Sequence, residues 1–77
     1  MYAKEVKELL DAAPFIPFSM YMANGKKLRI DHPELTMLSS GERFLVIGLP
    51  DDAVALADLR LATHIETHPA PQRTRRR

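Results

Sequence analysis

Cysteine and tryptophan are absent from this chain of 77 residues, and glycine occurs only three times. Without cysteine the chain forms no disulfide and no thiolate metal site, which excludes the disulfide-stabilised class of small domains. No apolar run reaches the roughly 20 residues that a membrane-spanning helix requires. The scattered Gly25, Gly41 and Gly48 also form no glycine-rich phosphate-binding loop. These absences favour one small domain that contains neither a membrane helix nor a nucleotide loop.

The net charge of +1 conceals an uneven distribution of charged residues. Residues 1–68 hold seven Lys and Arg against ten Asp and Glu, whereas residues 69–77 hold four arginines and no acid. Because that tail has no apolar residue larger than alanine, we predict a folded domain over residues 1–68 and a disordered Arg-rich tail over residues 69–77. Residues 1–5 show no apolar run of the signal-peptide type, so we expect a cytoplasmic protein.

Residues 2–13 have the pattern of a short amphipathic helix. Apolar residues recur at helical spacing, while lysine, glutamate and aspartate occupy the opposite side. Pro14 ends the helix because the residue before a proline is pushed out of the helical region. Pro14 and Pro17 together predict an extended connector up to Phe18. A helix of about three turns is marginal alone in water, so its apolar stripe must pack on another element.

From Phe18 onward the apolar period changes to two, which predicts a β-hairpin around Asn24-Gly25. A two-residue turn would place apolar and charged residues on the same face. A three-residue loop, Ala23-Asn24-Gly25 with Gly25 in the left-handed conformation, keeps the two faces distinct, so we predict this bulged loop. Its register pairs Phe18 with Ile30 and Met20 with Leu28 on the inner face, and Tyr21 with Lys27 and Ser19 with Arg29 on the outer face.

The rest of the chain predicts further strands. Residues 35–38 form a short strand or a helical turn, and three strands follow at about residues 43–49, 53–59 and 61–67. The strand over 43–49 is apolar on both faces, so we expect the barrel interior to cover one face and the helix the other. On the last strand, the inner face is expected to hold Leu61, Thr63 and Ile65. The predicted fold is mainly β (α+β), an N-terminal helix followed by a bent four- to five-stranded antiparallel SH3-like small barrel.

The sequence predicts no catalytic residue and no metal site. His64, Glu66 and His68 alternate along one strand face, but residues four apart on a strand are separated by about 13 Å. Ligands that lie about 2 Å from a zinc ion cannot come from both ends of such a line. The serines lie in no nucleophile-elbow context. We therefore expect a protein that is not an enzyme and has no cofactor and no small-molecule substrate.

The outer face of the hairpin is the candidate binding site. Tyr21 would lie there beside three cationic residues, Lys26, Lys27 and Arg29. Such surfaces bind single-stranded nucleic acid by stacking bases on the ring and pairing phosphates with the cations. The tail would add affinity that is independent of sequence through Arg73, Arg75, Arg76 and Arg77. The alternative is a solvated strand face with a Tyr–Lys contact worth a few tenths of a kcal/mol.

These residues carry a resemblance to a known family. Residues 17–28, Pro-Phe-Ser-Met-Tyr-Met-Ala-Asn-Gly-Lys-Lys-Leu, lie between a helix and the apolar segment 44–47. This arrangement resembles the bacterial Sm-like RNA chaperone (Hfq) family. The resemblance implies a helix and a bent five-stranded Sm-like barrel that assembles as a ring and binds RNA, with Tyr21 and Lys27 carried over from the hairpin. The Tyr-Lys-His motif of that family has no counterpart in residues 58–63.

A second resemblance covers nearly the whole predicted domain. Three motifs carry it: Pro14-Phe15-Ile16-Pro17-Phe18, the Asn24-Gly25 turn and His32-Pro33-Glu34. Their spacing is similar to that of a group of short uncharacterised bacterial proteins with a Pro-Phe-x-Pro-Phe opening and a His-Pro-Glu corner. This likeness implies a bacterial origin and a common fold, and it implies no activity.

Together these observations predict a small module that acts by binding. With roughly 68 foldable residues, the core contributes only a few kcal/mol, so we expect stabilisation by self-association as a homo-oligomer. The expected function is that of a protein-interaction or adaptor module whose protein partner the sequence does not name. The alternative is an Sm-like RNA-binding protein that uses the hairpin and the basic tail. No membrane partner is expected.

Overall fold

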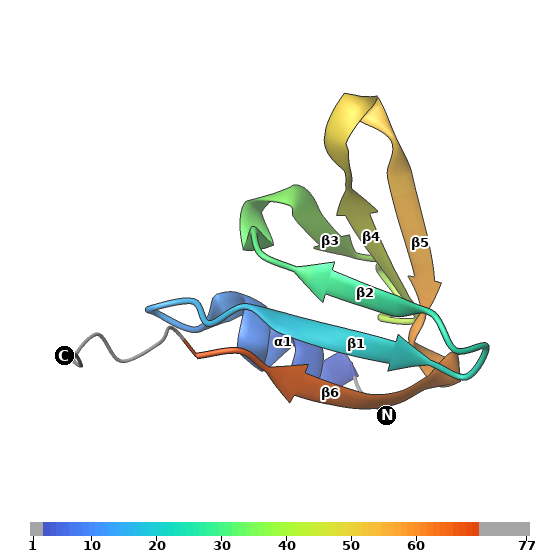
Figure 1. Cartoon of the computed structure of the whole chain (residues 1–77), viewed down its shortest axis with the longest axis horizontal. Helices are drawn as coiled ribbons and strands as arrows, with labels where there is room; N and C mark the ends of the chain where they lie inside the picture. Colours follow the sequence, from blue (N-terminus) through green and yellow to red (C-terminus); the bar gives the residue numbers. More distant parts are fainter. Residues whose placement is uncertain (1–2, 70–77) are drawn as a thin grey trace, which may run out of the picture.

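The structure, a computed structural model, describes residues 3–69, which form one α-helix and six strands in two antiparallel sheets (Figure 1). The elements are α1 (Ala3–Asp11), β1 (Phe18–Met22), β2 (Lys27–Ile30), η1 (Pro33–Leu35), β3 (Thr36–Leu38), β4 (Phe44–Gly48), η2 (Pro50–Asp52), β5 (Val54–Asp58), η3 (Leu59–Leu61) and β6 (Ala62–Thr67), where η marks a short 3-10 turn. The strand orders are β2-β1-β6 in the first sheet and β3-β4-β5 in the second. Within residues 3–69, no helix has the length and apolar character needed to cross a membrane.

The hairpin has the register that the sequence predicts. Phe18 pairs with Ile30, and Met20 pairs with Leu28. Gly25 has a φ of 88°, the left-handed conformation that glycine adopts without steric cost. The amide of Met22 donates to the carbonyl of Lys26 at 2.9 Å, which closes the bulged loop. The apolar faces of the two strands therefore coincide, as the period of two requires.

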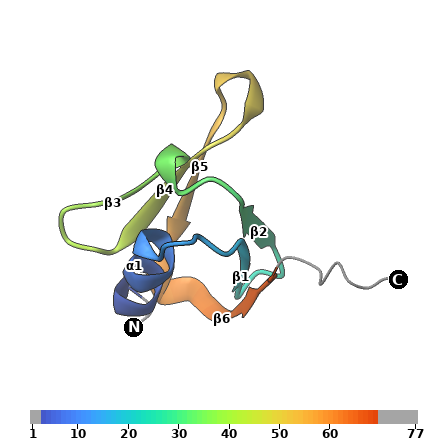
Figure 2. The same cartoon turned by 90° about the vertical axis from the view of Figure 1, so that its left-hand side faces the viewer.

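The core lies between the two sheets and the helix. Its buried apolar residues come from every layer: Val6, Phe18, Met20, Ile30, Leu45, Ile47, Ala57 and Leu59. Figure 1 shows α1 behind β1 and β6, and Figure 2 shows it on the side of the first sheet that faces β3 and β4. The helix ends at Asp11, three residues before Pro14. Its apolar stripe packs against the core as expected, because a helix this short needs a tertiary contact.

The predicted barrel of four or five strands differs from the observed arrangement. Residues 36–38 form a strand of their own, β3, which pairs with β4 and raises the count to six in residues 3–69. Within the same range no strand pairing joins the two sheets, so a closed barrel is not observed. The turn at Pro33–Leu35 separates β2 from β3 and sends the chain into the second sheet. The supported architecture is a helix packed with two three-stranded antiparallel sheets.

The prediction that β4 is covered on both faces is wrong. Leu45 and Ile47 are buried in the core, but Phe44 on the opposite face is exposed and Val46 is only half-buried. The helix packs on the core side of the sheets and therefore does not cover the Phe44 face. An apolar strand face is left open to solvent.

Strand β5 turns its small residues inward. Ala57 is buried opposite Leu45, and Ala55 lies opposite Ile47. The larger Val54 and Leu56 point to the solvent side of the sheet. Because all these residues are apolar, alternation alone does not say which set faces the core. The space left by Leu45 and Ile47 accommodates alanine there.

The predicted inner face of the last strand is interrupted by a β-bulge. Tyr21 pairs with His64, but the next residue, Met22, pairs with Ala62, so Thr63 is the extra residue. A bulge changes which side chains face inward beyond it. Of the three residues predicted to face inward, Ile65 packs against the core, whereas Leu61 lies in η3 and is exposed.

Candidate interaction surfaces

The outer side of the β2-β1-β6 sheet carries a row of polar contacts centred on Tyr21. The Tyr21 ring stacks on His64 of β6, with ring centroids 4.3 Å apart and an angle of 5° between the planes. From β2, the ammonium group of Lys27 lies 5.8 Å from the centroid of the same ring. The Tyr21 hydroxyl donates to Oε1 of Glu66 at 3.1 Å. Since β1 lies between β2 and β6, the ring is contacted from both sides.

Ser19 lies opposite Arg29 on the outer face of the hairpin, as the predicted register requires, but it is fully buried. The hydroxyl of Ser19 lies 2.8 Å from Nε2 of His68, which follows β6. The amide of His68 also donates to the carbonyl of Pro17 at 2.7 Å, which holds the end of the strand over Ser19. Although serine and histidine are in hydrogen-bond contact here, a hydroxyl with no exposed surface is not presented to a substrate.

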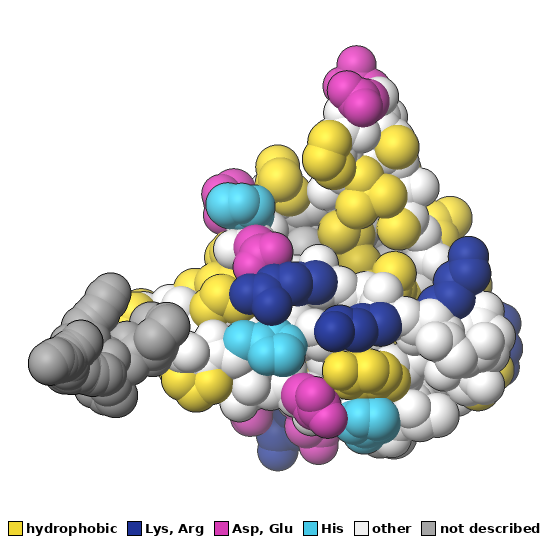
Figure 3. All heavy atoms as spheres, viewed as in Figure 1, with side chains coloured by type: hydrophobic (Ala, Val, Ile, Leu, Met, Phe, Trp, Pro, Cys, Tyr) yellow, Lys and Arg dark blue, Asp and Glu magenta, His cyan; other side chains and the backbone are white. Residues whose placement is uncertain are grey.

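The predicted nucleic-acid residues lie on this face or beside it. Lys27 and Arg29 lie on the outer side of β2, and Lys26 lies at the end of the loop. Arg29 is paired with Asp31 at 2.9 Å, so part of its charge is neutralised. Charged and histidine side chains gather over β1, β2 and β6 in Figure 3. The predicted tail residues lie outside the described part of the chain: Arg73, Arg75, Arg76 and Arg77.

A second charged group lies at one end of the β4-β5 pair, where it joins the start of β4 to the end of β5. Nη2 of Arg43 lies 3.1 Å from Oδ2 of Asp58, and Nη2 of Arg60 lies 3.3 Å from the same oxygen. The backbone amide of Arg60 donates to Oδ1 of Asp58 at 3.0 Å, which caps η3. The hydrogen bond from Arg43, together with those from Arg60, outweighs partial desolvation and lowers the pKa of Asp58 to about 2.

This lowered pKa predicts an acid-dependent contribution of Asp58 to stability. The folded state binds the proton more weakly than the unfolded chain, whose value is 3.8, so the contribution is complete above about 3.8 and is lost as the pH falls to about 2. We expect Asp58→Asn to lower the melting temperature by a few degrees at pH 7. The difference from the unmodified protein should shrink through that acidic window in thermal melts followed by circular dichroism.

The control for this prediction is Asp31→Asn, which removes an exposed carboxylate paired with Arg29. Because exposed ion pairs contribute little, this variant should melt close to the unmodified protein. A difference for Asp58→Asn that stays constant from neutral pH to pH 2 would contradict the assignment.

The outer side of the β3-β4-β5 sheet is apolar. One row crosses all three strands, with Met37 opposite Val46 and Val46 opposite Leu56. Met37 is 63% exposed and Leu56 is 69% exposed. The surface formed by these outward residues is called the apolar face; its members are Met37, Phe44, Val46, Val54 and Leu56. An antiparallel sheet with one face on the core normally carries polar residues on the other face, so this surface departs from the usual pattern.

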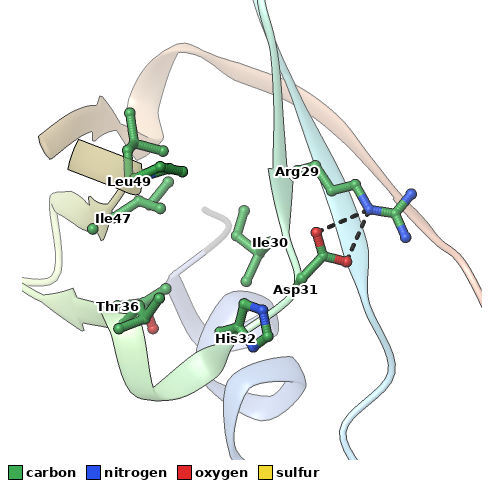
Figure 4. Close-up of a pocket in the computed structure, with 10 residues that line it drawn as sticks. Arg29, Ile30, Asp31, His32, Thr36, Ile47 and Leu49 are labelled. Carbon is green, nitrogen blue, oxygen red and sulfur yellow. Dashed lines mark hydrogen bonds and ion pairs between the residues drawn. The ribbon is translucent and has the colours of Figure 1, made fainter. Parts of the chain in front are cut away.

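Two hollows lie where the sheets separate. The larger, of about 680 Å³, lies between the hairpin and β5 and is lined by residues such as Met22, Lys26, Leu28, Ala55, Ala57 and Leu61. The smaller, of about 470 Å³, lies between the end of β2 and the end of β4. In Figure 4, Ile30 points toward Ile47 and Leu49 across the smaller hollow, while Arg29 points to the other side of β2. Both hollows follow the side of β2 that is not paired with β1.

No family model, no curated protein and no solved structure matches this chain. In the part of the chain that the structure describes, no three His, Cys, Asp or Glu side chains are grouped closely enough to hold a metal ion. Nε2 of His64 lies 3.6 Å from Oε2 of Glu66, but His68 is bonded to Ser19 instead of joining that pair. The surfaces described above are therefore the basis for a functional proposal.

Proposed function

We propose that this protein is a non-enzymatic interaction module that self-associates through the apolar face. The observation that supports this most strongly is the apolar row Met37–Val46–Leu56 across a complete three-stranded sheet, in which Met37 and Leu56 are exposed and Val46 is half-buried. Soluble monomers rarely expose large contiguous apolar patches, and such patches commonly mark protein interfaces. The outward turn of the larger residues of β5 adds Val54 and Leu56 to this surface.

A second copy of the chain is the occupant that fits this face best. The central row contains no charge, so two copies related by a two-fold axis would bring no like charges together there. The rim carries Arg43 and Asp58, which are of opposite sign and already paired. Two such faces would pack about 10 Å apart, as the sheets of a β-sandwich do. Burial of the face would also stabilise a domain whose own core is small.

We also propose that the fold is related to SH3-like or Sm-like small barrels. A helix followed by short antiparallel strands in hairpin steps supports a diverged small barrel that is open between β2 and β5. RNA binding through Tyr21, Lys26, Lys27 and Arg29 stays the alternative. The contacts of the Tyr21 ring with His64 and Lys27 make it the weaker one, because base stacking requires an accessible ring face.

Met37→Glu tests self-association directly. In a two-fold interface this change would bury two unpaired carboxylates, so we expect the dissociation constant to rise by at least about 100-fold. Analytical ultracentrifugation over a wide concentration range should show the unmodified chain above its monomer mass of 8.7 kDa and the variant at that mass.

The matched control is Leu35→Glu, which introduces the same charge at an exposed leucine of η1, outside the apolar face. Its association should be unchanged. The proposal fails if the unmodified chain stays monomeric at all concentrations. It also fails if the Met37 and Leu35 variants associate equally well.

A further inference from the structure

The unpaired edge of β2 presents backbone groups to solvent in a defined order. In an antiparallel pair, hydrogen-bonded and non-bonded residues alternate along each strand. Because Met22 donates to Lys26, the residues of β2 whose backbones bond to β1 are Leu28 and Ile30. The amide and carbonyl groups of Lys27 and Arg29 therefore point away from β1, toward the free edge.

Strand β5 has a free edge of the same kind. The amide of Leu49 donates to the carbonyl of Ala53 at 2.8 Å, and the amide of Leu59 donates to the carbonyl of Arg43 at 2.8 Å. By the same alternation, Ala55 and Ala57 bond to β4. The backbones of Val54, Leu56 and Asp58 then face away from β4. Within residues 3–69, no strand is paired with either of these edges.

The two free edges border one hollow. The hollow of about 680 Å³ is lined by Lys26 and Leu28 from the hairpin and by the segment 55–58 of β5. Its volume lies within the range typical of ligand pockets. Most of its floor is apolar, from Met22, Leu28 and the alanines of β5. Figure 3 shows apolar side chains over β4 and β5 beyond the Lys and Arg side chains that follow β2. We call this hollow, with the free edge of β2, the edge groove.

The charge along the edge groove indicates what would bind there. Within the described residues, Lys26 and Lys27 form no ion pair with an acidic side chain, and Arg29 forms an ion pair with Asp31. A strand added beside β2 would alternate its side chains between the groove floor and the outer face, where Lys27 and Arg29 lie. Apolar side chains fit the floor, and acidic side chains complement the outer cations. A basic segment would meet like charges along the same edge.

We propose that the edge groove binds an extended segment of a partner protein in which apolar and acidic residues alternate. The segment adds to the first sheet as a fourth strand beside β2, a mode in which backbone hydrogen bonds provide affinity and alternate side chains provide specificity. The edge groove shares Leu56 with the apolar face, but Met37, the residue changed in the self-association test, lies on β3 and not on the edge groove, so the two proposals can be tested independently.

The probe is a capped eight-residue peptide of alternating glutamate and valine, labelled for fluorescence anisotropy. Lys27→Pro should weaken its binding at least tenfold, because proline removes an edge amide that does not bond to β1. Lys27→Ala keeps that amide and should weaken binding only a few-fold. A peptide with lysine in place of glutamate should bind at least tenfold more weakly than the acidic one. Amide shifts in NMR spectra should concentrate on residues 26–30 and 54–58.

A second pair of variants covers the case in which Lys27→Pro does not fold. Leu61→Glu places a carboxylate at an exposed position of the groove and should weaken peptide binding at least tenfold, whereas Met37→Glu places it outside and should not. The proposal is overturned if the folded protein does not bind the acidic peptide at millimolar concentration, or if the Leu61 and Met37 variants bind it equally. It is also overturned if Lys27→Pro abolishes self-association, or if single-stranded RNA displaces the peptide from these residues.

Discussion

Replacement of Phe18 by alanine is expected to reduce the free energy of unfolding by about 3–5 kcal/mol. Phe18 has no exposed surface, lies at the start of the central strand of the first sheet, and has its ring centroid 6.1 Å from that of Phe15. Native domains are stable by only about 0.05–0.15 kcal/mol per residue, so this loss is a large part of the total. Urea titration followed by far-ultraviolet circular dichroism should show a variant that is largely unfolded without denaturant.

Phe44→Ala is the matched control for this result. It removes the same side chain from an exposed position on the apolar face, where the expected cost is below about 1 kcal/mol. The comparison should be made at a concentration where both proteins are monomeric, because Phe44 belongs to the proposed self-association surface. Equal losses for the two variants would contradict the placement of the core between the sheets.

His68→Phe is expected to destabilise the fold by about 1–3 kcal/mol. The substitution keeps a ring over Ser19 but removes the only side-chain hydrogen bond found for its hydroxyl among the described residues. A buried hydroxyl without a partner costs its full desolvation penalty, whereas a buried methyl group does not. The measurement is again the free energy of unfolding in urea.

The reason for this loss is tested by removing the hydroxyl as well. Adding Ser19→Ala to His68→Phe should restore most of the stability, with a coupling energy of about 1–2 kcal/mol in the double-mutant cycle. If the double variant is as unstable as the sum of the single changes, the destabilisation comes from packing around residue 68. The hydrogen bond would then contribute nothing.

The loop length and the register of the hairpin could be predicted from local sequence alone. Only a three-residue loop ending at Gly25 puts Met20 and Leu28 on one face, and a shift by one residue would reverse every side chain of the strand. The observed register and the left-handed Gly25 agree with that argument. The effect of Pro14 is equally local because it restricts only Ala13, and the helix ends two residues before its predicted end, at Asp11.

The contacts of the candidate surfaces depended on a pairing that no local pattern specifies. Once β6 lies beside β1, His64 stands opposite Tyr21 and His68 reaches Ser19. The sequence shows that His64, Glu66 and His68 alternate along one strand, a spacing too long for a zinc site. Only their position beside Tyr21 and Ser19 shows that they form hydrogen bonds and a ring stack instead. The sequence pattern placed Ser19 on the outer face but did not indicate that it is buried there.

The sequence alone determined the N-terminal helix, the hairpin with its register and the mainly β class, because these depend on the period of apolar residues and on the backbone limits of proline and glycine. Tertiary structure decided which side of an all-apolar strand faces inward. Leu45 and Ile47 occupy the core, the alanines of β5 fit beside them, and Val54 and Leu56 are left outside. It also decided that β2 and β5 keep free edges, because the strands pair into two separate three-stranded sheets and no local residue preference encodes that division.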